Sequence, residues 1–163
     1  MAELQAVGWR VQVVATPAGD QWIDNDAVER LLSAAVRRQQ RTPDQPKSRE
    51  RADAIVAAPM TFNSVNKLAV GIADTLAHSA MSEALGEGIP FLAVPMVNQY
   101  LAGHPSWDQN VQRLADAGVA WISIHDGARG ELALVESGTG QQLVEAFKPQ
   151  WISEQLPRIA AAS

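Results

Sequence analysis

The chain of 163 residues has 47% apolar and 19% charged side chains, a balance typical of one folded globular domain. Its net charge of -5 excludes a sequence-wide basic surface for nucleic acid, and no apolar run approaches the roughly 20 residues of a membrane helix. Cysteine is absent, which excludes disulfides, thiolate metal sites and cysteine nucleophiles.

The first part of the chain predicts one strand, one helix and a loop. Residues 1–11 lack the basic start and apolar centre of a signal peptide, so we expect a cytoplasmic protein. Residues 9–16 (WRVQVVAT) are rich in β-branched side chains and predict a strand. Residues 24–39 begin with capping residues and space their apolar side chains as a helix does. Residues 40–51 are polar and predict a solvated loop, with an anion site as the alternative.

The middle of the chain alternates apolar runs with helical patterns. Residues 52–59 and 89–95 (IPFLAVP) predict strands that are buried on both faces. Residues 64–88 repeat apolar side chains at helical spacing and predict one helix that Gly86 and Gly88 end. Residues 106–119 predict a further helix that closes at Gly118.

The remaining residues complete the pattern. Residues 120–124 predict a strand, and residues 140–163 predict one helix, or two that are separated at Pro149. This alternation predicts an α/β fold, a doubly wound and mostly parallel sheet with helices on both faces, in one domain over residues 1–163.

Ligands of such sheets bind beyond the carboxyl ends of the strands. Residues 16–22, 59–64 and 94–107 follow the predicted strands and carry unusual polar and aromatic side chains. The first segment is also explained by a simple turn, and the second by a helix cap. A cap needs one oxygen, however, whereas the second segment has several candidates, and the N–H groups of a helix N-terminus suit a phosphate or a carbonyl.

Two motifs and a third segment resemble a known family. APMTFNSVNKLAVGIADTLA is similar to the P-A-S-A-N-T segment and following helix of flavin-containing cysteine decarboxylases, including phosphopantothenoylcysteine decarboxylase. PMVNQYLAGHP is similar to that family's P-A-M-N-x-x-M-W-x-x-P segment. VQVVATPAGDQWID resembles the family's second strand and the loop after it, so that the resemblance covers about residues 8–118.

The resemblance implies an FMN site that is built between subunits of a homo-oligomer, a trimer or larger. The side chains that it places at the flavin and its ribityl chain are Thr61, Phe62, Asn63 and Ser64. Those that it places near the phosphate, the ring or the cofactor are Thr16, Ala18, Trp22 and Met96. It also implies that Asn98 meets the carboxylate of a small substrate.

Three departures from the family pattern concern catalysis. The family's histidine, about eight residues before an aspartate like Asp53, is replaced by Gln45. No cysteine stands in the late flap, and Val97 replaces the first methionine of the second motif. Among the histidines, His104 lies in a ligand-facing loop, whereas we interpret His78 and His125 as packed or surface residues; none has metal-ligand spacing.

Residues 1–9 resemble the tail of the family's first helix, so the opening strand and its glycine- and serine-containing turn are not recognised. The sequence fits a fragment, a sheet of different order, or a strand from another chain, and we expect weakened FMN affinity if the fold persists. Trp107, Trp121 and Trp151 fit either subunit contacts or the core.

Three functions stay open. The first is an FMN-dependent decarboxylase (a lyase) or oxidoreductase that acts on a small carboxylated molecule. The second is a non-catalytic flavin- or nucleotide-binding oligomer with a regulatory role, which the missing histidine and cysteine favour. The third is a flavin prenyl-transfer enzyme, whose basic phosphate-binding residues are not recognisable.

Overall fold

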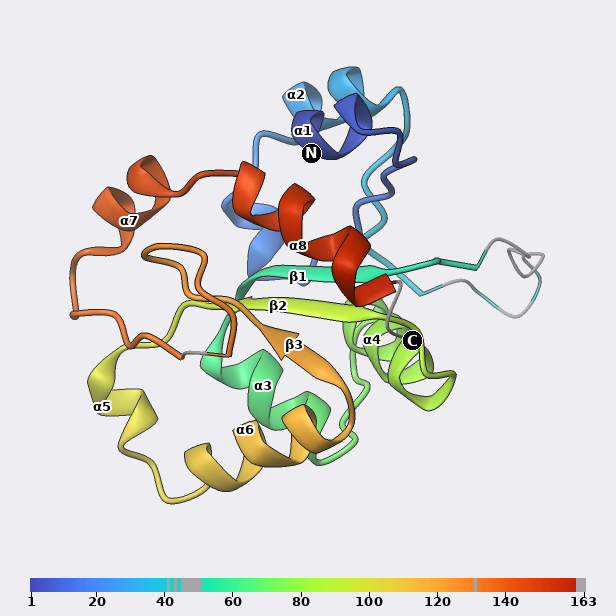
Figure 1. Cartoon of the computed structure of the whole chain (residues 1–163). Helices are drawn as coiled ribbons and strands as arrows, with labels where there is room; N and C mark the ends of the chain where they lie inside the picture. Colours follow the sequence, from blue (N-terminus) through green and yellow to red (C-terminus); the bar gives the residue numbers. More distant parts are fainter. Residues whose placement is uncertain (41, 43, 45–50, 131, 161–163) are drawn as a thin grey trace.

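The computed structural model describes residues 1–40, 42, 44, 51–130 and 132–160. At the centre of the fold lies a parallel sheet of three strands in the order β1-β2-β3 (Figure 1). These strands are β1 (Ile55–Met60), β2 (Phe91–Pro95) and β3 (Val119–Trp121). Parallel pairing requires crossover connections, and the helices after β1 and β2 supply them.

Strand β2 is buried on both faces and so separates two cores. Phe91 and Ala93 pack with side chains of α3 (Phe62–Ala69) and α6 (Trp107–Asp116), whereas Leu92 and Val94 pack with α8 (Gln150–Ala160). The alternation follows from the two-residue period of a strand. Helices therefore cover both faces of the sheet, which confirms the predicted doubly wound α/β fold (Figure 1).

The other helices surround this centre. α4 (Leu76–Gly86) leads into β2, and α1 (Ala2–Ala6) packs against α8. The remaining helical segments are η1 (Gly19–Gln21), α2 (Asn25–Leu32), α5 (Gln99–Ala102) and α7 (Gly140–Ala146). None of the described helices has the length and hydrophobicity that crossing a bilayer would take.

The strand predicted over residues 9–16 is wrong. Only Val14 forms an isolated parallel bridge, and its partner is Arg37. The Ala15 N–H donates to the Arg37 carbonyl, and the Arg37 N–H donates to the Val13 carbonyl. Because the residues after α2 satisfy this backbone locally, the segment does not join the sheet, and β1 is an edge strand of the three described strands.

The single helix predicted over residues 64–88 is also wrong, because α3 and α4 are separate helices. Gly71 has a φ of +76°, a left-handed conformation that interrupts a helix. Thr75 then caps α4 by accepting a hydrogen bond from the His78 N–H. As a result Ile72, which the helical pattern places on the apolar face, is 46% exposed.

Two further boundaries differ from expectation. The helix predicted over residues 24–39 ends at Leu32, where Ser33 takes a left-handed conformation. The predicted strand over residues 120–124 is shorter and forms β3. In contrast, separate helices α7 and α8 confirm the interruption at Pro149, which was one of the two alternatives.

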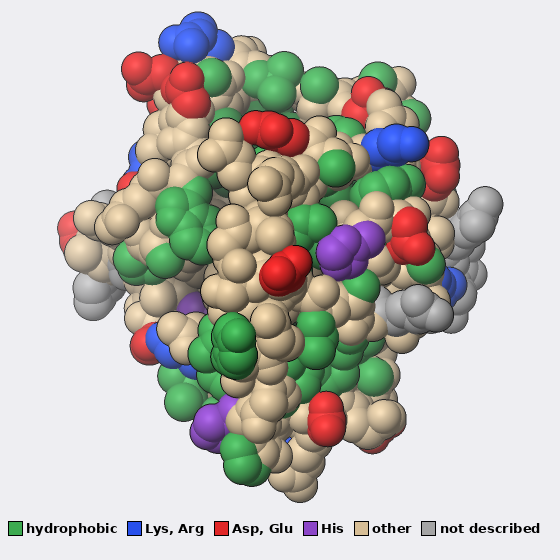
Figure 2. Space-filling model, turned by 90° about the vertical axis from the view of Figure 1, so that its left-hand side faces the viewer, with side chains coloured by type: hydrophobic (Ala, Val, Ile, Leu, Met, Phe, Trp, Pro, Cys, Tyr) green, Lys and Arg blue, Asp and Glu red, His purple; other side chains and the backbone are tan. Residues whose placement is uncertain are grey.

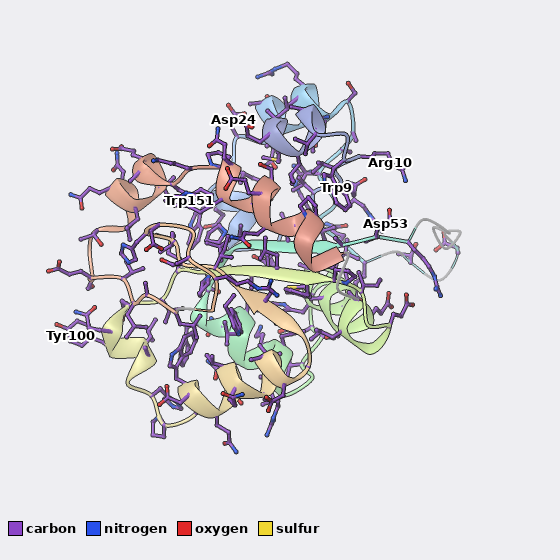
Figure 3. All side chains as sticks on the ribbon, viewed as in Figure 1. Trp9, Arg10, Asp24, Asp53, Tyr100 and Trp151 are labelled. Atoms are coloured by element: carbon purple, nitrogen blue, oxygen red, sulfur yellow. The ribbon has the colours of Figure 1, made fainter. Side chains whose placement is uncertain are left out.

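The sequence left two locations open for three tryptophans, the core or a subunit contact. Trp107 and Trp121 are buried, which favours the core alternative for both. Trp151 lies on α8 (Figure 3). It is half-buried and packs against Gly127 and Phe147. A Cβ on Gly127 would lie only 2.3 Å from the Trp151 Cγ, so this glycine is required for the contact.

We predict that Gly127→Ala destabilises the chain by about 2–4 kcal/mol, because it combines a left-handed φ of +73° with a collision against Trp151. Gly130→Ala is the matched control, since its φ is +87° but its Cβ would meet nothing within 4 Å. The measurement is the free energy of unfolding by urea. Equal losses in the two variants would contradict the packing role of Gly127.

Candidate functional site

The carboxyl ends of β1 and β2 are held together by a hydrogen bond. The Met96 N–H donates to the Met60 carbonyl at 3.0 Å, after a register shift between Ala57 and Met60. Pro59 lies within this shift and has no N–H to donate to the ladder. The two segments that the sequence singled out, after β1 and after β2, therefore start side by side.

Thr61 caps helix α3, as the helix-cap explanation of residues 59–64 predicted. Its Oγ1 accepts from the Ser64 N–H at 3.4 Å, and its carbonyl accepts from the Val65 N–H at 3.0 Å. The neighbouring Asn63 is exposed, and its side chain has no hydrogen-bond partner among the described residues. The first N–H groups of α3 have no acceptor within the helix, so the segment presents donors.

Phe62 is engaged by other aromatic side chains. Its ring stacks on Trp107 with 5.8 Å between centroids and meets the edge of His104 at 5.9 Å. The His104 Nδ1 accepts from the Ser106 N–H at 3.1 Å. Of the two expected ligand-facing aromatics, Phe62 is thus half-buried in protein contacts, and Trp22 is 64% exposed.

An amide network that the sequence reasoning missed fastens α3 to α6. The Asn66 Oδ1 accepts from the Ser106 Oγ at 2.9 Å and from the Asn110 Nδ2 at 2.6 Å. The Asn66 Nδ2 donates to the Phe62 carbonyl at 2.8 Å. This network fixes the first turn of α3, and its only sequence signal is an asparagine one turn after Phe62.

His78 is a second residue whose role the sequence did not reveal. It is 3% exposed, and its Nε2 lies 3.3 Å from the Ser64 Oγ. Its Nδ1 lies 2.8 Å from the Thr75 Oγ1 and 3.5 Å from the Asp74 Oδ1. Residues 64 and 78 meet because the chain turns between α3 and α4, which a single helix would not allow.

Burial lowers the pKa of His78 below its ordinary value of 6.5. The Lys67 ammonium lowers this pKa further, and the Asp74 carboxylate opposes the effect. Lys67 and Asp74 pair with each other at 2.6 Å, and the hydrogen bond from Lys67 lowers the pKa of Asp74. The His78 imidazole is therefore neutral near pH 7.

Asn98 caps the short helix α5 at the end of β2. Its Oδ1 accepts from the N–H groups of Tyr100 at 3.1 Å and Leu101 at 2.9 Å. Because the oxygen is used in this way, the Nδ2 amide is the part of Asn98 that can meet a ligand. No described residue accepts a hydrogen bond from this Nδ2.

Asn98 and Met96 line a small cavity of about 170 Å³. The loop before α7 and the first residue of α7 line its other side, and the full lining is Met96, Asn98, Val135, Glu136, Ser137, Gly138 and Gly140. A Cβ on Gly140 would lie 2.8 Å from the Met96 Cε, so α7 begins directly against this methionine. The adjacent Val97 is 3% exposed and belongs to the core.

The remaining expected segment, residues 16–22, lies at η1. The Thr16 Oγ1 accepts from the Gly19 N–H at 3.0 Å, which is the turn that its alternative explanation predicted. Ala18 and Trp22 are exposed. Among the described residues no hydrogen bond joins this segment to Thr61–Ser64 or to Asn98, so its convergence on a shared ligand stays a prediction.

Two expectations about catalysis concern other parts of the chain. Gln45, at the position of the family histidine, lies outside the described residues. Within residues 1–40, 42, 44, 51–130 and 132–160, no three His, Asp or Glu side chains gather as a metal ion requires. The described geometry offers hydrogen-bond donors and apolar surface rather than metal ligands.

The sequence profile of the Flavoprotein family matches residues 1–159. The chain belongs to this family. The family resemblance seen in the two motifs is thereby confirmed.

Curated relatives share only part of their length with the chain. A coenzyme A biosynthesis bifunctional protein CoaBC of Thermococcus kodakarensis is 29% identical over 72 residues, which are 44% of this chain and 18% of that protein. A dihydromethanopterin reductase (acceptor) of Methanosarcina mazei is 43% identical over 47 residues, 29% of this chain and 20% of that protein. The chain thus matches about a fifth of the length of these relatives.

Solved structures share the fold. The FMN-dependent cysteine decarboxylase SpaF superposes with a TM-score of 0.64 at 23% identity, over 89% of this chain and 85% of SpaF. A dodecameric FMN-dependent UbiX-like decarboxylase from Escherichia coli O157:H7 also has a TM-score of 0.64, at 14% identity, over 94% and 84% of the two chains. At these identities the comparison establishes the architecture.

We predict that the free energy of unfolding falls as the pH drops from about 7.5 to 5, because the unfolded His78 takes up a proton near pH 6.5 before the folded one does. This contribution is complete above the unfolded pKa and is lost as the pH falls through the window toward the lowered folded pKa. His78→Gln should flatten the dependence in urea unfolding. An unchanged slope in that variant would show that His78 does not titrate as its burial requires.

Proposed function

We propose that this chain is an FMN-binding flavoprotein and that the flavin lies at the carboxyl ends of β1 and β2. The main observation in support is that two polar segments lie side by side at the carboxyl ends of β1 and β2, where the Met96–Met60 hydrogen bond holds the strand ends together. The family membership supports a flavin, and SpaF, which shares the architecture, is described as FMN-dependent.

The residues present fit such a cofactor. The start of α3 and the Asn63 amide are donors, and an isoalloxazine edge and a phosphate are rich in acceptor atoms. Met96 offers a thioether beside them, and it is half-buried in the wall of the small cavity. We further propose that Thr61, Phe62 and Ser64 form the floor, and that Thr16, Ala18 and Trp22 approach the phosphate and ring.

Bound FMN would supply an electron-accepting ring system for decarboxylation or redox chemistry. The chain itself would hold the ring with the first turn of α3 and orient a small substrate with Asn98. We propose that this substrate carries a carboxylate, because the Asn98 Nδ2 can donate to a carboxylate oxygen while its Oδ1 is fixed by the α5 cap.

A non-catalytic flavin-binding role is the second candidate. The chain contains no cysteine, and Gln45 stands at the position of the family's histidine, so two groups of the usual decarboxylation route are missing. In that role the same donors would bind flavin or a nucleotide. Binding itself, and not a reaction, would then have the regulatory effect. The two candidates share the cofactor and differ in turnover.

We also propose a homo-oligomer, of three or more copies. Large apolar side chains are exposed near the site, among them Tyr100 at 76% and Val144 at 61%. Figure 2 shows the side of the molecule on which α5 and α7 lie, and hydrophobic side chains gather there in several patches. Tyr100 points away from the sheet on the outer side of α5 (Figure 3). Such exposed aromatic surface is typical of subunit contacts.

We predict that the purified chain quenches FMN fluorescence on binding and that Asn63→Ala weakens this binding about 5–10-fold, since one hydrogen bond is lost from an exposed side chain without protein partners. Glu83→Ala is the control, because Glu83 is exposed on α4, which leads to the opposite edge of the sheet. A wild-type chain that binds no FMN would contradict the proposed cofactor.

Turnover separates the two candidate functions. Asn98→Asp keeps an oxygen for the α5 cap, loses the amide donors and adds a negative charge, so it should abolish release of carbon dioxide from carboxylated thiols while FMN stays bound. The assay follows carbon dioxide and the flavin absorbance together. Full activity in Asn98→Asp would contradict the substrate role, and a wild-type chain without turnover would favour the non-catalytic candidate.

A further inference from the structure

A continuous set of polar contacts links the candidate site to the first turn of α4. It runs from Thr61 through Ser64 and His78 to Thr75, with 3.3 Å between the Ser64 Oγ and the His78 Nε2 and 2.8 Å between the His78 Nδ1 and the Thr75 Oγ1. His78 is 3% exposed, so its ring nitrogens depend on these hydroxyl groups.

The Thr75 hydroxyl determines which nitrogen of His78 carries the proton. Its Oγ1 already accepts from the His78 backbone N–H at 3.2 Å, so its own proton needs an acceptor, and Nδ1 at 2.8 Å is in reach. The competing partner is Asp74, which would accept from a protonated Nδ1. Its Oδ1 is 3.5 Å away, and its other oxygen pairs with Lys67 at 2.6 Å. This geometry favours protonation at Nε2.

A proton on Nε2 has a consequence for Ser64. The Ser64 Oγ then accepts from His78, and it also accepts from the Thr61 hydroxyl at 3.3 Å. A serine oxygen has two lone pairs, and both are used in this arrangement. The Ser64 hydroxyl proton is therefore directed away from the network.

We propose that His78 is a positioning residue that fixes Ser64 as a hydrogen-bond donor toward the ligand at the ends of β1 and β2. The identity of that ligand rests on the proposed function. The ligand atom that meets Ser64 is then an acceptor, such as a carbonyl oxygen, an unprotonated ring nitrogen or a phosphate oxygen. His78 does not itself contact the ligand.

The first test needs no ligand. The full chain is prepared with ¹⁵N-labelled histidine, and the ring nitrogens of His78 are assigned by comparison with His78→Gln. The expected spectrum at pH 7.5 shows a protonated Nε2 and an unprotonated Nδ1. A protonated Nδ1 would overturn the proposal, because Ser64 would then donate to His78 and not to a ligand.

The second test measures FMN affinity by fluorescence quenching. We expect Ser64→Ala and His78→Leu to weaken FMN binding by a similar factor of about 5–10, and the double variant to be no weaker than either, because both remove the same donor. His78→Gln places an amide N–H near the Nε2 position and should stay within about twofold of the wild type. Ser79→Ala is the control in the same helix, since the Ser79 Oγ bonds to the Ala73 carbonyl.

A comparison of His78→Asn with His78→Gln keeps the test decisive if His78→Leu misfolds. If His78→Leu does not fold, His78→Asn replaces it, because its shorter amide lies near Nδ1 and does not reach Ser64. Weak binding in His78→Asn with retained binding in His78→Gln supports the proposal, and equal affinities in the two variants overturn it. A wild-type chain without FMN affinity overturns the proposed function instead, and the protonated nitrogen alone then decides the role of His78.

Discussion

The hydrogen bond from the Met96 N–H to the Met60 carbonyl aligns the ends of two parallel strands, and the candidate site depends on this alignment. Directly after this bond the chain starts a helix from each strand, α3 capped by Thr61 and α5 capped by Asn98. A slip of one residue in either strand would reverse the side chains of its end and separate the two caps. Pro59 and the local register shift therefore matter for where the caps lie.

The caps also determine the chemical character of this edge. Capping consumes oxygen acceptors, since the Thr61 Oγ1 and the Asn98 Oδ1 receive backbone N–H groups. What is left to face outward is rich in donors, namely the Asn98 Nδ2, the first N–H groups of α3 and, with His78 in place, the Ser64 hydroxyl. Structural and binding duties thus use different atoms of the same side chains. A ligand rich in hydrogen-bond acceptors, such as FMN, suits this arrangement better than a cationic one.

The sequence predicted those parts of the fold that depend on residues close together along the chain. The apolar runs that became β1 and β2, and the oxygen cap of Thr61, follow from short-range periodicity and capping chemistry. The expected burial of both faces holds for β2 but is wrong for β1, where Ala58 and Pro59 are exposed because no further described strand or helix covers them. Residues 9–16 have the composition of a strand, but a strand also needs a partner, and the Val13 carbonyl and the Ala15 N–H bond to Arg37 instead. Because Gly71 interrupts the helical pattern, His78 faces Ser64, a contact that no periodicity indicates.

The most direct test of the account is a crystal structure of the chain with bound FMN. We predict flavin density within hydrogen-bond distance of the first turn of α3 and beside Met96, with the Asn98 Nδ2 left available for the substrate. Density at any other surface, or side chains of the protein filling that edge in the presence of saturating FMN, would contradict it.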